Sequence, residues 1–144
     1  MKRLVLRAVL RATALITLTA VGLAAAYWDA RDSSGGANLG LGLLVVLGQA
    51  LVASVWAAGD ACRRPVGGTL AVWATASVFG SVGGLLMSRL LEAQDSGWSW
   101  TVLFSDLLLV APTMAALTFA SAGLGALVGA TLRGPQSARS GPSS

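Results

Sequence analysis

The sequence contains no histidine and one cysteine, Cys62. Without histidine, no imidazole can ligate haem iron or act as the general base of a Ser-His-Asp triad. A single cysteine excludes a disulfide within one chain and a cluster of thiolate metal ligands. The sequence therefore predicts no catalytic residue, no metal site and no cofactor, and we expect a protein that is not an enzyme.

Charged residues are also scarce, at 11% of the chain against about 25% in a typical soluble domain. Hydrophobic residues make up 55%, and they gather in long runs near the roughly 20 residues that cross a bilayer core. We therefore predict an all-α membrane protein in which residues 1–132 form a compact bundle of four transmembrane helices. The predicted spans cover about 8–28, 37–58, 68–91 and 101–132.

The first apolar run allows two interpretations. Its basic start, Met1 to Arg11, and its small residues Ala24, Ala25 and Ala26 fit either an uncleaved first span or a cleavable secretory signal. We favour the span, because Ala8 to Leu10 lengthen the run if Arg11 extends its side chain to the headgroups. At the other end, residues 133–144 are rich in Gly, Pro and Ser, which predicts a disordered cytoplasmic tail.

Orientation is predicted from the Lys and Arg residues on each side of the spans. With a cytoplasmic N-terminus, only Arg31 and Arg89 lie outside. Eight lie inside: Lys2, Arg3, Arg7, Arg11, Arg63, Arg64, Arg133 and Arg139. This bias predicts that both termini are cytoplasmic. The nearly Lys-free, Arg-, Ala- and Gly-rich composition favours a bacterial source and thus a bacterial plasma membrane.

Polar residues between the spans are expected to face water. The turn from Gly59 to Gly67 contains Asp60, Arg63, Arg64 and Pro65, a combination that ends a helix at a membrane surface. The basic residues are spread over the ends of the apolar runs, with no aromatic and basic patch for a phosphate backbone, so we expect no nucleic-acid partner.

Small and hydroxyl residues predict the faces on which the helices pack. In the third span, a continuous stripe at helical spacing comprises Ser77, Gly80, Ser81, Gly84 and Ser88. Similar faces are predicted in the other spans: Thr13, Thr17, Ala20 and Ala24 in the first; Gly42, Gln49, Ala53 and Ala57 in the second; Thr113, Ala116, Ala120 and Gly123 in the fourth.

Asp106 is the one charge inside the fourth apolar run, and an ionisable group in a span is by default a candidate functional residue. Helical spacing places it on the same side as Thr113, whereas Gln49 lies near the middle of the second span. These three residues form the candidate intramembrane polar site. The alternatives are structural: Asp106 forms a hydrogen bond near the outer interface, caps the start of the span or pairs with a neighbour, and Gln49 makes one interhelical hydrogen bond. We expect Arg89, on another face of its helix, to extend to the outer headgroups.

Two function classes follow. The first is a non-enzymatic accessory or assembly subunit, or a self-associating module, whose partners are the lipid bilayer and either itself, as a homo-oligomer, or other membrane proteins. The second is a small transporter or channel whose pathway involves Asp106. The polar stripes and the short loops favour the first.

Overall fold

A computed structural model describes residues 2–32 and 39–133, with side chains described for residues 4–25, 43–93 and 97–133. Four helices follow one another in up-down order: α1 (Lys2–Asp32), α2 (Leu39–Arg63), α3 (Val66–Ser96) and α4 (Trp100–Leu132). The predicted tail lies outside the described residues, apart from Arg133. The all-helical architecture of four long apolar helices packed together is confirmed.

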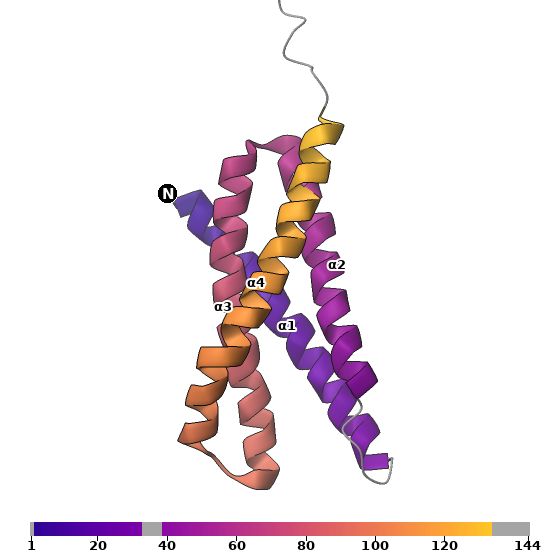
Figure 1. The fold of residues 1–144 in the computed structure, drawn as a ribbon, viewed down its shortest axis with the longest axis vertical. Helices are drawn as coiled ribbons and strands as arrows, with labels where there is room; N and C mark the ends of the chain where they lie inside the picture. The colour runs from indigo at the N-terminus through magenta and orange to yellow at the C-terminus, as the bar shows by residue number, and fades with distance from the viewer. Residues whose placement is uncertain (1, 33–38, 134–144) are drawn as a thin grey trace, which may run out of the picture.

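The helices do not pack in chain order. The α2–α4 contact is the most extensive, followed by α1–α3 and α3–α4, whereas α2 and α3 touch only slightly and α1 and α4 do not touch within the described residues. In Figure 1, α4 lies in front of the α2–α3 pair and α1 lies behind it, so the described parts of the two helices cross in the view without touching. The ring of contacts is therefore α1–α3–α4–α2.

Two short turns fix the connections. Pro65 precedes α3, and its carbonyl accepts a hydrogen bond from Thr69 N at 3.2 Å. At the other end of α3, Gly97 adopts a φ of +79° and donates its backbone N–H to Ala93 O at 3.2 Å, closing the helix. A residue with a Cβ rarely adopts that φ, so glycine permits the abrupt turn into α4.

The interior is built from small side chains and the outside from large ones. The core cluster consists of Leu15, Ala53, Ala57, Ala61, Trp73, Ala76, Ala122 and Ala126. Large aliphatic residues instead cover the outer surface, including Leu44, Leu51, Val55, Leu108 and Leu124, which are 60–75% exposed. All four helices are long and apolar enough to cross a membrane. This arrangement suits lipid as the surrounding medium, because close backbone approach rather than burial of bulky groups holds helices together there.

Helix α4 packs on α2 through backbone contact. An added Cβ at Gly125 would clash with the backbone carbonyl of Ser54, and one at Gly129 would clash with that of Ala58. The close approach permits hydrogen bonds between the helices: Ser54 Oγ donates to Ser121 O at 2.8 Å. At the helix ends, the Arg133 guanidinium donates to the carbonyls of Ala61, Cys62 and Arg64, which terminate α2.

Helix α3 packs on α1 along the serine and glycine stripe. Gly80 and Gly84 lie against Leu15 and Thr19, whose side chains would be 3.0 and 3.3 Å from added Cβ atoms. Ser77 is 1% exposed and its hydroxyl has no hydrogen-bond partner.

The packing face predicted for α4 is wrong, and the one predicted for α1 is half-buried only at Ala20 and Ala24. Thr13, Thr17, Thr113, Ala116 and Ala120 are exposed. The buried residues are instead Ala8, Arg11, Ala12 and Leu15 in α1, and Leu103, Ala111, Thr118, Ala122, Gly125, Ala126 and Gly129 in α4. An Ala- and Gly-rich helix carries small residues on opposite faces, and the partner helix determines which face is buried.

Candidate functional site

Asp106 lies near the end of the bundle that contains the α3–α4 turn. Its carboxylate pairs with the Arg89 guanidinium, which also pairs with Glu92 one turn further along α3. The Arg89 and Asp106 side chains are 27% and 16% exposed, respectively. The expected extension of Arg89 to the headgroups is therefore wrong: α4 packs against the side of α3 that carries Arg89, and the nearby carboxylates hold the guanidinium.

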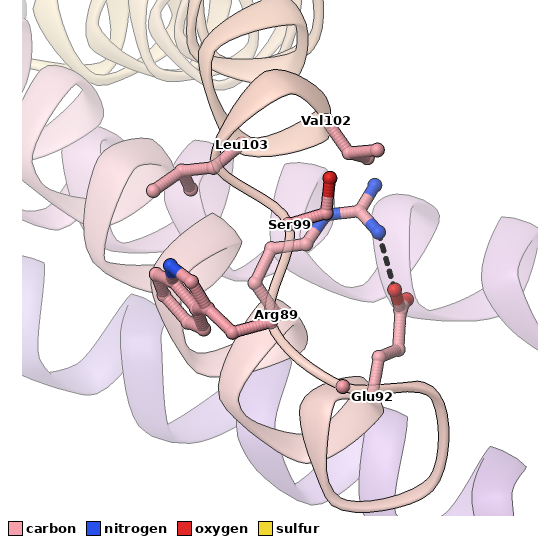
Figure 2. A pocket seen from close by; sticks show the side chains of 7 residues that line it. Arg89, Glu92, Ser99, Val102 and Leu103 are labelled. Atoms are coloured by element: carbon pink, nitrogen blue, oxygen red, sulfur yellow. Dashed lines mark hydrogen bonds and ion pairs between the residues drawn. The ribbon is translucent and has the colours of Figure 1, made fainter.

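Arg89 also borders a small pocket beside this pair, of about 120 Å³. Figure 2 shows Arg89 and Glu92 joined at its edge, with Ser99, Val102 and Leu103 on the adjoining turn and helix. With Asp106 bonded to Arg89, charge pairs join α3 and α4 near the turn between them and leave Asp106 engaged in pairing.

Gln49 bridges α2 to α1. Its amide nitrogen donates to Thr19 Oγ1 and, at 3.3 Å, to Leu15 O. Thr19 Oγ1 donates in turn to Leu15 O at 2.9 Å. An interhelical hydrogen bond, the simpler of the roles expected for Gln49, is thus present, and it engages the Gln49 amide nitrogen and the Thr19 hydroxyl within the bundle.

The three residues of the candidate polar site do not meet. A cavity of about 200 Å³ lies between the four helices and is bordered by Gln49, but neither Asp106 nor Thr113 lines it. The Thr113 side chain is exposed and donates to Leu109 O within its own helix at 2.8 Å. Along α3 the cavity is lined by four members of the predicted stripe, Gly80, Ser81, Gly84 and Ser88.

A second charged cluster lies toward the opposite end of the bundle, and sequence reasoning missed it. Arg11 of α1 pairs with Asp60 of α2, and their side chains are only 6% and 16% exposed. The Arg11 guanidinium carbon lies 5.1 Å from the Trp56 ring centroid and 5.7 Å from that of Trp73, so two indoles flank the cation. Arg11 does not extend out of the bundle as expected, because Asp60, Trp56 and Trp73 hold its guanidinium between three helices.

Asp60 was expected in a water-facing turn, but α2 continues to Arg63 and keeps it inside the bundle. The available signal was its spacing: Trp56 and Asp60 are four residues apart and share a helix face with the buried Ala53 and Ala57. Arg11 Nε remains buried without a hydrogen-bond partner.

No protein-family model, curated protein or solved structure matches this chain. The four packed helices, each long and apolar enough to span a membrane, suggest a class, that of small helical membrane proteins. Function within that class has to be argued from the sites themselves.

Proposed function

We propose that this protein is a non-enzymatic membrane module that acts by lateral helix association, with a second copy of itself or with another membrane protein. The supporting observation concerns α4, which has small residues on two opposite faces. One face, centred on Ala122 and Gly125, packs on α2. The other, formed by Thr113, Ala116, Ala120 and Gly123, has no packing partner within the described residues.

This second surface, the outer α4 face, fits association for a physical reason. Thr113, Ala116 and Ala120 are exposed, and an added Cβ at Gly123 would meet nothing within 4 Å. Leu109 and Leu127, 71% and 60% exposed, flank the small residues along the same side of the helix. A hollow between leucines lets a partner helix approach closely, and in lipid such packing supplies the attraction between helices.

Cysteine crosslinking tests the proposal. In a Cys62→Ser background, Ala116→Cys is expected to form disulfide-linked dimers, or adducts with a partner, in native membranes. The matched control is Leu117→Cys, at nearly the same depth but turned about 100° around the helix, which is expected to crosslink weakly. Equal crosslinking at both positions, or none at Ala116, would contradict association through this face.

A substitution gives a second readout. Ala120→Leu fills the hollow without entering the folded interior, so the protein should remain folded while the discrete complex measured in native nanodiscs is lost. Leu117→Ile is the control and should leave the complex unchanged. A strict monomer for the unaltered protein, with no co-purifying membrane partner, would overturn the proposal.

A further inference from the structure

We propose that the end of the bundle formed by the start of α1 and the α2–α3 turn binds an anionic phospholipid, with its phosphate in a basic pocket and an acyl chain in the groove between α1 and α3. This inference does not depend on lateral association through the outer α4 face, which lies on a different helix.

The headgroup pocket has a volume of about 160 Å³. It is lined by Leu4, Arg7, Arg11, Asp60, Arg64, Pro65, Gly68, Thr69 and Val72. Three guanidinium groups thus face one carboxylate. Asp60 is engaged by Arg11, and the guanidinium groups of Arg7 and Arg64 have no carboxylate partner among the described side chains, those of residues 4–25, 43–93 and 97–133. The pocket therefore has unbalanced positive charge where anionic headgroups would lie.

The beginning of α3 adds donors to this pocket. Helix α3 has 31 residues and begins after Pro65 with no side-chain cap hydrogen bond. Its first backbone N–H groups, at Val66, Gly67 and Gly68, have no acceptor in a preceding turn of helix; of these residues Gly68 lines the pocket, whereas Val66 and Gly67 lie beside it in sequence. Added Cβ atoms at the two glycines would meet nothing within 4 Å, so a phosphate oxygen can approach the backbone closely.

A buried donor also points to an anionic ligand. Arg11 lines the pocket, its side chain is 6% exposed, and its Nε has no hydrogen-bond partner. A buried guanidinium N–H that lacks a partner is costly, and a small shift of the Arg11 side chain toward the pocket would bring it within reach of a phosphate oxygen.

The groove beside the headgroup pocket is the proposed binding site of the acyl chain. An apolar groove of about 540 Å³ runs between α1 and α3 and shares Leu4 and Val72 with the headgroup pocket. Its other lining residues are Val5, Ala8, Val9, Ala12, Thr13, Ile16, Ala71, Thr75 and Phe79. Small side chains at Ala8, Ala12 and Ala71 leave the space that a hydrocarbon chain requires. A basic pocket beside an apolar groove is complementary to a lipid, because the charged headgroup of a lipid is attached directly to its hydrocarbon chains.

The test is lipid binding to the full-length protein in detergent, followed by native mass spectrometry with dioleoylphosphatidylglycerol and, separately, dioleoylphosphatidylcholine. We expect phosphatidylglycerol to bind about tenfold more tightly. Arg64→Gln should weaken its binding about fivefold, the effect of one basic side chain near an anionic headgroup. Arg63→Gln removes the same charge from the next position, which does not line the pocket, and should change binding less than twofold.

The groove has its own matched pair. Ala71→Phe fills the groove from an exposed position and should weaken phosphatidylglycerol binding. Ala74→Phe, exposed on the same helix but absent from the groove, should not. Circular dichroism shows whether both variants fold. If Ala71→Phe fails to fold, Thr75→Phe at another exposed groove position replaces it.

Three results would overturn the proposal. One is equal binding of the two lipids, and another is an equal loss in Arg63→Gln and Arg64→Gln, which would reflect overall charge. The third is binding of glycerol 3-phosphate as tight as that of the lipid, which would mean that the groove contributes nothing. Both arginine variants are expected to fold. The Arg133 guanidinium donates to the backbone carbonyl of Arg64, which Arg64→Gln retains.

Discussion

Arg11 and Arg89 are both paired with an aspartate on another helix, yet their surroundings differ. Arg11 is buried with Asp60 between two tryptophans, whereas Arg89 is 27% exposed and shares its charge between Asp106 and Glu92. Removing one partner of a buried pair leaves an uncompensated charge and typically costs about 3–5 kcal/mol. Asp106 is no more exposed than Asp60, at 16%, but Arg89 is less buried than Arg11 and would keep Glu92 as a second partner. The two sites should therefore respond differently to the same substitution.

Asp60→Asn is expected to destabilise the protein by about 3 kcal/mol or more, because Arg11 stays buried without a counter-charge. Asp106→Asn, the matched control, should cost about 1 kcal/mol, since Arg89 keeps Glu92. The measurement is the free energy of unfolding in detergent by titration with sodium dodecyl sulfate. A larger loss for Asp106→Asn than for Asp60→Asn would contradict this assignment of the buried pair.

Single residues show where sequence reasoning reaches its limit. Asp106 was recognisable because it interrupts an apolar run, and Gln49 because an amide in a span requires a partner. Asp60 and Arg11 lie near the ends of apolar runs, where a charge normally reaches water. Their burial depends on how α1, α2 and α3 meet, and no pattern within one helix contains that information.

At the scale of elements, the four helices were predictable and one of their central contacts was not. The spans are set by hydropathy and length, and most helix ends extend beyond the predicted limits, as α2 does in reaching Arg63, although α2 begins later, at Leu39, and α4 ends at Leu132 as predicted. The pairing of α2 with α4 depends on Gly125 and Gly129, where the two backbones approach too closely for any Cβ. Because α4 has small residues on two opposite faces, its sequence alone does not show which face packs inward. The small residues of α2 allow its backbone to approach the face that carries Gly125 and Gly129.

Gly125→Ala is expected to lower the free energy of unfolding by about 1–3 kcal/mol, because its Cβ would meet the Ser54 backbone, which cannot rotate away as a side chain can. Gly123→Ala on the outer α4 face is the control. Its Cβ meets nothing, and helix propensity predicts a stability that is unchanged or higher by up to about 1 kcal/mol. Equal losses in both variants would show that α2 and α4 are not in backbone contact at Gly125.

At the scale of the whole molecule, the ends of the bundle differ in charge. The end that contains the α2–α3 turn carries the basic pocket and Arg133, whereas the other contains Glu92 and Asp106 around Arg89. The positive-inside bias favours placing the first end in the cytoplasm, and the acidic lipids of that leaflet would then lie beside the proposed headgroup pocket. The orientation of the protein and its lipid site are therefore linked.

Cys62 provides the test of orientation, because it is the single cysteine of the sequence and lies exposed at the end of α2. A membrane-impermeant maleimide is expected to leave it unlabelled in intact cells and to label it after permeabilisation. Ser99→Cys in a Cys62→Ser background, exposed in the α3–α4 turn, should show the reverse and react in intact cells. Labelling of Cys62 from outside would invert the orientation and move the basic pocket into the outer leaflet. In that case the positive-inside bias could not account for the clustering of arginines in the pocket, and binding of an anionic lipid would have to account for it.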